Sequence, residues 1–268
     1  MTIKSRIENM LPKKLRDILR LWYRTFIKGQ PAILEKPSGL AIGYFSGFEM
    51  AYRTNTADER VIKQSFENDI IFSGVPEYQP DGDHIIIDVG AHIGTFSIFA
   101  ASKTKQGRVY AIEASQDSFN FLKINVALNK CNNVSIHHLA LADKDGSIAL
   151  YHDQGSWGHS TVKRLSLSSE TVNSCTLSSF LEENGINECH FMKLNCEGSE
   201  FPILLNTPND VLRKFGIILV MYHCDLWENN TEDDLVSHLM SSGFKCVFRN
   251  RDPKRGWIIA ENLTKLHV

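Results

Sequence analysis

The chain has 268 residues, 43% of them hydrophobic, so it can bury a substantial core in one large α/β domain or two small ones. A formal net charge of −2 gives no case for a nucleic-acid partner, and no apolar run approaches the length that spans a membrane. The six cysteines form no C-x-x-C pair and the ten histidines show no zinc-binding spacing, which favours a cytosolic protein with reduced thiols.

A basic amphipathic helix is predicted over residues 12–28. Pro12 suits the start of a helix, and apolar residues then recur at three- and four-residue steps. Residues 1–30 hold eight Lys and Arg against two acidic residues, a local charge of +6 that leaves −8 for the rest. Such a helix could pack on the domain or on another protein, or it could contact anionic lipid at a membrane surface. With the linker that follows, it forms a first region, 1–39, before the domain at 40–268.

Two short strands are predicted on either side of Ser46 and Gly47, followed by a short helix over residues 57–68. Beyond them strands alternate with helices. The predicted strands cover residues 85–89, 109–113, 134–141, 190–195, 217–223, 244–250 and 256–262. This alternation favours an α/β fold with a mostly parallel sheet, helices on both faces and an antiparallel finish. A hairpin is also expected between residues 147–153 and 161–165.

The turn after the first strand of this series has the features of a ligand site. In DVGAHIG, Gly90 and Gly94 let the backbone pass close to a ligand and lead into a helix, although a turn that merely links strand to helix uses the same glycines. Asp88 would repel a pyrophosphate and attract an ammonium group. Glu113, at the end of the next strand, can accept hydrogen bonds from ribose hydroxyls. These features favour S-adenosylmethionine over NAD, as does the missing middle glycine of G-x-G-x-x-G.

Five segments, in this order, resemble those of a known family. They are DVGAHIGTFS, the strand ending at Glu113, LALADKDGSIAL at 139–150, TLSSFLEENG, and MKLNCEGSEFPILLN at 192–206. Over roughly residues 40–225 the chain is similar to FkbM-type S-adenosylmethionine-dependent methyltransferases. The resemblance implies a Rossmann-like class I methyltransferase fold with a seven-stranded sheet. It also implies O-methylation of small molecules, often sugars or polyketide alcohols.

The resemblance extends to the cofactor site. The predicted cofactor-binding residues are Asp88, Gly90, Ala91, His92, Gly94, Glu113, Ala140, Leu141 and Asn195. Ala140 and Leu141 are expected near the adenine, because they follow the third strand on the same sheet edge. Where the family pattern reads K-x-D-x-E-G, this chain has Asn195. An asparagine can orient a ligand but cannot act as a base and binds a hard cation poorly, so we predict no metal.

The reaction that this implies needs few catalytic groups. Methyl transfer from a sulfonium is an in-line displacement, so the protein must chiefly position the nucleophile and exclude water. An aliphatic hydroxyl keeps its proton at neutral pH, and a general base would help. His223, at a strand end, would titrate in the useful range, or it simply caps that strand. Glu197 matches the family motif and could bind the acceptor or take its proton, whereas Glu200 is assigned no role.

Trp157 and His159, in the segment QGSWGHST, are predicted to line the acceptor pocket, where an aromatic ring could stack on a sugar. We therefore predict a cytosolic O-methyltransferase whose cofactor is S-adenosylmethionine and whose acceptor is a small hydroxylated molecule, in first place a sugar or glycan unit. Two alternatives stay open. One is an NAD-dependent oxidoreductase. The other is a cofactor-binding module without catalysis, associated with a membrane assembly, an interpretation that Asn195 keeps open.

Overall fold

The computed structural model describes residues 39–54, 56–152, 158–163 and 165–265. Contacts within the chain separate it into two units, Met1–Leu40 and Ala41–Val268, so the described residues belong almost wholly to the second. The helix predicted over residues 12–28 and the predicted acceptor residue Trp157 lie outside the described residues. Among the described helices, none is both long and apolar enough to span a lipid bilayer.

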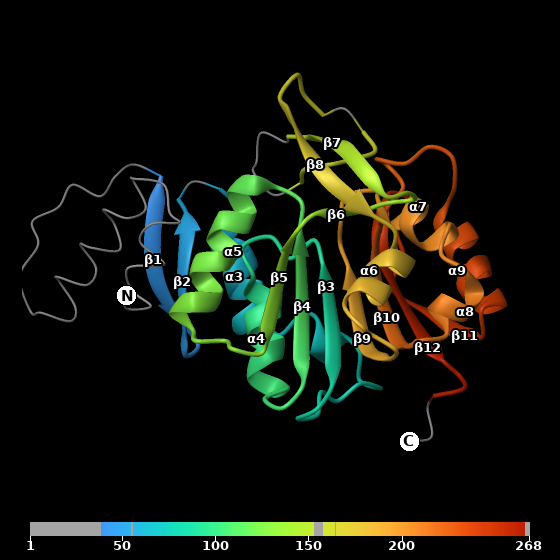
Figure 1. Cartoon of the computed structure of the whole chain (residues 1–268), viewed down its shortest axis with the longest axis horizontal. Coiled ribbons are helices and arrows are strands. Elements are labelled where there is room, and N and C mark those ends of the chain that lie inside the picture. Colours follow the sequence, from blue (N-terminus) through green and yellow to red (C-terminus); the bar gives the residue numbers. More distant parts are fainter. Residues whose placement is uncertain (1–38, 55, 153–157, 164, 266–268) are drawn as a thin grey trace, which may run out of the picture. The chain divides into compact units, whose positions relative to one another are not determined.

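A seven-stranded sheet forms the centre of the second unit (Figure 1). In spatial order its strands are β11 (Phe244–Asn250), β12 (Arg255–Asn262), β10 (Phe215–His223), β9 (Cys189–Leu194), β3 (Ile85–Val89), β4 (Arg108–Glu113) and β5 (Val134–His138). β12 pairs antiparallel with both neighbours, and the other pairs are parallel. The mostly parallel sheet with an antiparallel final strand is therefore confirmed. The strand order reverses at β3, and open parallel sheets bind ligands at such a point.

Strand side chains point alternately into buried clusters on the two faces of the sheet. In β3, Ile86 belongs to one cluster and Ile87 to the other. The first face is covered by α4 (Thr95–Lys103) and α5 (Gln116–Leu128). The second is covered by α6 (Leu177–Glu183), α7 (Glu200–Leu205), α8 (Asn209–Leu212) and α9 (Glu232–Ser241). The prediction of helices on both faces is confirmed.

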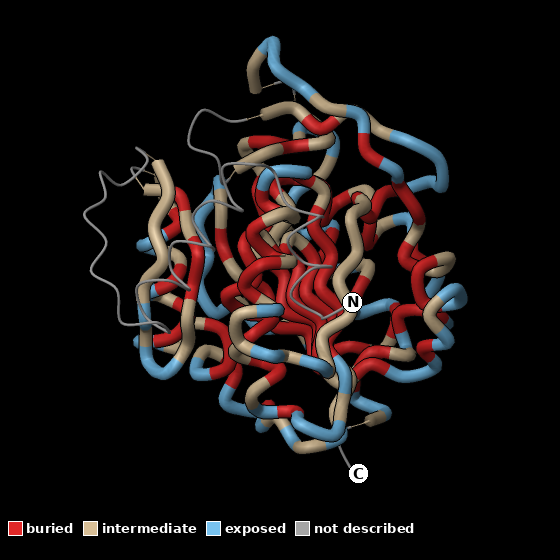
Figure 2. The backbone as a smooth tube through the Cα atoms, turned by 60° about the vertical axis from the view of Figure 1, so that its left-hand side comes forward, coloured by how far each residue is buried: buried red, intermediate tan, exposed pale blue. Residues whose placement is uncertain are grey.

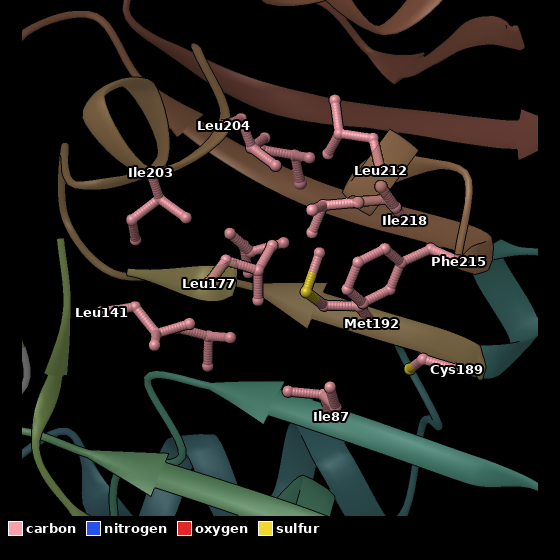
Figure 3. Close-up of a cluster of buried hydrophobic side chains, with 14 of the residues drawn as sticks. Ile87, Leu141, Leu177, Cys189, Met192, Ile203, Leu204, Leu212, Phe215 and Ile218 are labelled. Atoms are coloured by element: carbon pink, nitrogen blue, oxygen red, sulfur yellow. The ribbon is translucent and has the colours of Figure 1, made fainter. Parts of the chain in front are cut away.

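The cluster on the second face holds these helices to the sheet. Figure 3 shows Leu177 and Leu212 of the helices meeting Ile87, Met192 and Ile218 of the strands. Burying a side chain of this size contributes about 1.5–3 kcal/mol. The central strands are buried along most of their length (Figure 2), which explains why their sequences are near-continuous apolar runs.

A second sheet follows the carboxyl end of β5. Its order is β6 (Ala140–Leu141), β8 (Ser169–Cys175) and β7 (Gly146–Tyr151). The strand predicted over residues 134–141 is thus divided between two sheets at Leu139. The predicted hairpin with residues 161–165 is wrong, because β8 pairs with the whole of β7, whereas Tyr151 makes only an isolated bridge to Ser160.

The chain reaches the large sheet through a hairpin and a short helix, at the predicted positions. The hairpin consists of β1 (Leu40–Phe45) and β2 (Phe48–Arg53), and the helix is α3 (Asp58–Phe66). Two asparagines, one in α5 and one at its C-terminal cap, bind β2 as a neighbouring strand would. Asn125 accepts from the N–H of Ala51 at 2.7 Å and donates to its carbonyl oxygen at 3.0 Å. Asn129 makes the same pair of bonds with Glu49, at 3.0 and 2.7 Å.

Candidate active site

A cavity of about 450 Å³ opens at the carboxyl ends of β3, β4 and β9, where the strand order reverses. Its size is that of pockets for small molecules and cofactors. Seven of the predicted cofactor residues line it, namely Gly90, Ala91, His92, Glu113, Ala140, Leu141 and Asn195. The fold therefore brings four separate stretches of the chain together at the predicted edge of the sheet.

The two glycines of the turn between β3 and α4 act differently. Gly90 has φ +73°, and a Cβ there would lie 2.1 Å from the backbone oxygen of Asn195. Gly94 has φ +90°, and its Cβ would meet Leu122 Cδ1 at 2.6 Å. Gly94 does not line the cavity, so its predicted ligand contact is corrected. It is the residue before α4, and its lack of a side chain lets the start of that helix pack closely on α5. Gly90, by contrast, lets the turn and the end of β9 meet beside the cavity.

Asp88 does not face the cavity. Its side chain is fully buried, and it accepts from Lys193 Nζ at 2.9 Å and from Ser97 Oγ at 2.6 Å. Lys193 stands opposite Asp88 on the neighbouring parallel strand and neutralises the carboxylate. The same ammonium group donates to the carbonyl oxygens of Val89 and Gly90, at 3.3 and 2.9 Å. The predicted contact of Asp88 with the cofactor is thus corrected. Asp88 instead binds Lys193, and Lys193 binds the two carbonyl oxygens at the start of the turn.

Glu113 ends β4 at the cavity wall with its carboxylate fixed by two backbone donors. Oε2 accepts from the N–H of His92 at 2.7 Å, and Oε1 accepts from the N–H of Ser115 at 2.8 Å. Each carboxylate oxygen has a further acceptor position. The geometry is therefore compatible with the predicted hydrogen bonds to ribose hydroxyls.

Asn195 offers the cavity an acceptor that has no partner. Its Oδ1 is buried and makes no hydrogen bond with any residue that the structure describes. A buried polar atom in this state costs about 1–3 kcal/mol, which a bound donor would recover. An ammonium or hydroxyl group of a ligand could supply that donor.

Two acids follow β9, Glu197 in the loop before α7 and Glu200 as the first residue of that helix. Glu197 lines the cavity and has φ +52°, in the left-handed region. Glu200 is fully buried and accepts from the N–H groups of Cys196 at 2.6 Å and Gly198 at 2.8 Å. These two N–H groups stand on either side of Glu197 in the chain. Glu200 therefore fixes the loop that presents Glu197 to the cavity.

His223, the last residue of β10, connects the two acids. Its Nδ1–H donates to Glu200 Oε1 at 3.1 Å, and its Nε2 lies 3.5 Å from Glu197 Oε1. The imidazole is fully buried and does not line the cavity. The general base predicted at His223 therefore lies behind the cavity wall, and Glu197 is the one of the two predicted catalytic residues that lines the cavity. Glu200, assigned no role from the sequence, holds His223.

Burial and charge set the protonation of these three groups. Burial raises the pKa of Glu197 above its ordinary value of 4.5, although His223 and Arg255 pull it down. Burial disfavours the imidazolium of His223, but the two carboxylates outweigh it and raise its pKa. Burial also opposes the charge of Glu200, yet His223 and backbone donors outweigh it and lower its pKa. These shifts favour a charged ion pair between Glu200 and His223. They also make Glu197, in front of this pair, a stronger proton acceptor than an ordinary glutamate.

The remaining wall of the cavity includes Met221, Arg255 and Trp257. Arg255 binds Asp225 through Nε and Nη2, at 3.0 and 2.9 Å, and its Nη1 lies 3.5 Å from Glu197 Oε2. Sequence reasoning missed Arg255 and Trp257. The feature that could have indicated them is the antiparallel direction of β12, because it brings the start of that strand to the edge where the parallel strands end.

His159 lines this wall too, and its contact with the acceptor stays a prediction. Beside it, Ser160 Oγ donates to the carbonyl oxygen of Glu197 at 2.7 Å. The segment that carries His159 is thus attached to the Glu197 loop. Among the described residues, no group of three His, Cys, Asp or Glu side chains is arranged to hold a metal ion.

The sheet, the glycine turn and the acid at the end of β4 define a Rossmann-like methyltransferase. A family model described as "Methyltransferase FkbM domain" matches residues 88–249, more than half of the chain, and the chain belongs to this family. Its cofactor is S-adenosylmethionine. Membership excludes the alternative of an NAD-dependent oxidoreductase.

Individual relatives match only in part. A segment of 83 residues is 31% identical to "Methyltransferase 1" of Beauveria bassiana (strain ARSEF 2860) and covers 31% of this chain and 33% of that protein. A segment of 71 residues is 34% identical to the uncharacterized protein MJ1452 of Methanocaldococcus jannaschii, covering 26% of this chain and 27% of the relative. The matches thus span about a third or less of these curated relatives.

Similar solved structures have low sequence identity. The M. jannaschii protein TYW2 in complex with AdoMet is 15% identical, with a TM-score of 0.44, over 87% of this chain and 90% of that one. The precorrin-6y C5,15-methyltransferase of Geobacter metallireducens GS-15 is 14% identical, with a TM-score of 0.43, over 72% and 88% of the two chains.

The residues around the cavity fit S-adenosylmethionine. Gly90 lines the cavity with backbone atoms, and its lack of a side chain lets the turn lie against the end of β9 beside the ligand space. The unpartnered Oδ1 of Asn195 can accept from the ammonium group. Glu113 can accept from the ribose hydroxyls, and Ala140 and Leu141 offer an apolar surface for the adenine.

Proposed function

We propose that the protein transfers a methyl group to a hydroxyl of a small acceptor, in first place a sugar or glycan unit. One observation carries this proposal. Glu197 presents a carboxylate to the cavity, and His223 and Glu200 support it from behind. An alcohol oxygen becomes a good nucleophile only as it loses its proton, so a proton acceptor at this place favours a hydroxyl as the target.

When bound, S-adenosylmethionine supplies an activated methyl group on a sulfonium and leaves as a neutral thioether. Glu197 accepts the proton of the acceptor hydroxyl as the new C–O bond forms, and its raised pKa makes it the stronger base. His223 lies 3.5 Å behind and offers a charge that balances the carboxylate before the proton arrives. Ser160 and Glu200 hold the loop in place, so that Glu197 need not move during the reaction.

Trp257 supports a sugar as the acceptor. Its half-buried indole lines the cavity on the same wall as Arg255, which supplies N–H donors. A flat aromatic surface next to charged hydrogen-bonding groups suits a ring that has apolar C–H faces and a polar rim. The role predicted for Trp157 can thus be filled by Trp257.

The test is methyl transfer by the purified chain to a panel of free sugars, nucleotide sugars, polyketide alcohols and RNA, followed by release of S-adenosylhomocysteine and by product mass. We expect a product methylated on oxygen. Glu197→Gln should lower turnover by about a hundredfold or more and leave S-adenosylhomocysteine binding intact. Glu228→Gln, which changes an exposed glutamate, is the matched control. Transfer to RNA alone, or full turnover in Glu197→Gln, would contradict the proposal.

A further inference from the structure

The segment before the family match forms part of the cavity. The match begins at Asp88, yet α3 lines the cavity with Gln64 and Ser65 and packs beside α4 (Figure 1). Ser65 Oγ donates at 3.1 Å to Oγ1 of Thr95, in the first turn of α4. The residues 40–66, here named the extension, therefore contribute a wall of the site.

Arg53, at the end of β2, is the centre of a buried ion pair in this extension. Its Nε donates to Asp58 Oδ2 at 2.9 Å and its Nη2 to Asp58 Oδ1 at 3.0 Å, the two-point geometry of a strong pair. Its Nη1 donates to Asp117 Oδ2 at 2.9 Å, and the guanidinium lies 5.2 Å from the centre of the Phe121 ring. Partners on α3 and α5 thus fix the guanidinium in one place.

His92 joins this ion pair to the cavity. Its Nε2 lies 2.9 Å from Arg53 Nη2 and 3.2 Å from Asp58 Oδ1. Its backbone N–H donates to Glu113 Oε2, and the residue lines the cavity. His92 has φ +54°, and a residue other than glycine keeps that conformation only where its surroundings hold it. The hydrogen bond from His92 to Glu113 therefore depends on contacts made by the extension.

We propose that Arg53 and Asp58 are positioning residues for the cofactor. They hold His92 in its left-handed conformation, and His92 in turn orients the Glu113 carboxylate toward the ribose of S-adenosylmethionine. The extension, which lies outside the family match, is then required for tight cofactor binding. The inference rests on the cofactor of the family and on the ribose contact of Glu113, and it is independent of the acceptor.

The test is the affinity of the full chain for S-adenosylhomocysteine, measured by titration calorimetry. Arg53→Met and His92→Ala should each weaken binding about tenfold. The double variant should bind no more weakly than His92→Ala alone, because Arg53 acts through His92. The affinity for adenosine, which carries the same ribose, should fall in the same variants and by similar factors. Lys63→Gln removes an exposed ion pair with Glu59 from the same extension and should bind as the unmodified chain does.

Arg53→Met leaves Asp58 buried without its partner and can prevent folding, so Arg53→Lys is the second variant. Lysine keeps the charge but lacks the fork that reaches Asp58 and His92 together. We expect it to fold, judged by a melt without ligand, and to bind several-fold more weakly. Unchanged affinity in Arg53→Lys, or additive losses in the double variant, would overturn the proposal. No binding by the folded unmodified chain would instead overturn the cofactor assignment, whereas binding without transfer to a hydroxyl would count against the proposed function alone.

Discussion

Glu197 is held in a conformation that a glutamate rarely adopts. Its φ of +52° costs about 1–3 kcal/mol and persists only where neighbouring groups hold it. Those groups are Ser160, which donates to its carbonyl oxygen, and Glu200, which accepts from the N–H groups of the adjacent residues. The loop therefore fixes the carboxylate before any acceptor arrives, which lowers the entropic cost of the reaction.

The pKa of Glu197 predicts how the rate depends on pH. The base acts when deprotonated, and burial raises its pKa, so the rate should fall on acidification at a pH above the 4.5 of an ordinary glutamate. Arg255→Gln should move this fall to still higher pH, because Arg255 lowers the pKa of Glu197. Initial rates measured across a pH series would check both expectations. A fall at lower pH in Arg255→Gln would contradict this account of the carboxylate.

Gly90 provides a test of the cofactor turn. In Gly90→Ala the Cβ would stand 2.1 Å from the Asn195 oxygen at a φ of +73°, so the turn or the end of β9 must move. We expect affinity for S-adenosylhomocysteine to fall about a hundredfold, equivalent to about 2.8 kcal/mol. Gly82→Ala is the matched control, since its Cβ would meet no atom within 4 Å. Equal affinities of the two variants would show that the turn does not contact the ligand.

Residues whose signals are local in the sequence were predictable. Gly90 and Glu113 each follow directly from a strand end, and both line the cavity. The partner of Asp88 was not predictable, because Lys193 lies 105 residues further along the chain and only the register of β3 with β9 brings them together. Arg53 was missed because its contact with His92, 39 residues further along the chain, arises only from the packing of the extension.

At the scale of elements, the alternation of strands and helices was sufficient to predict the large sheet. It could not predict that β7 pairs with β8, since the sequence of β8, SETVNSC, is mostly polar and β-pairing partners are set by tertiary packing. Nor could it reveal how the extension attaches. That attachment depends on Asn125 in α5 and on Asn129, four residues later at the C-terminal end of that helix, which both bind β2.

We predict different losses of stability when each of the two asparagines is replaced. Asn125→Ala would remove buried bonds to both backbone groups of Ala51 and to the carbonyl oxygen of Ile93. We expect the free energy of unfolding to fall by about 3 kcal/mol, because buried groups lose their partners. Asn129→Ala, at a half-buried position, should lose about 1 kcal/mol. Denaturant titration would compare them, and equal losses would argue against the buried attachment.

For the whole molecule, the functional unit is larger than the matched segment. The family match covers residues 88–249, whereas the cavity is lined from Arg60 in α3 to Trp257 in β12. Both flanks contribute residues to the wall of the cavity. Differences in acceptor between members of the family could therefore arise outside the segment by which the family is identified.

Ligand binding should stabilise this whole unit. At about 100 times its dissociation constant, S-adenosylhomocysteine adds about 2.7 kcal/mol to the free energy of unfolding, which raises the melting temperature by a few degrees. NADH at the same concentration should leave the melting temperature unchanged. A rise in melting temperature with NADH alone would contradict the assignment of S-adenosylmethionine as the cofactor.

The membrane contact of residues 12–28 stays a prediction, which sedimentation with anionic vesicles would test.

Asn125 also links two segments of the chain, strand β2 and the cofactor turn, that would otherwise open independently of each other. The Ala51 N–H donates to its side chain, and the same side chain donates to the Ile93 carbonyl oxygen in the cofactor turn. Deuterium can replace the Ala51 amide proton only when β2 parts from α5, and that event removes the two bonds with Ala51 that orient the side chain of Asn125 beneath the turn. The exchange rate of a single amide in the extension thus reports how often the side chain that supports the cofactor turn loses its anchor in β2, and how far a bound ligand slows that event.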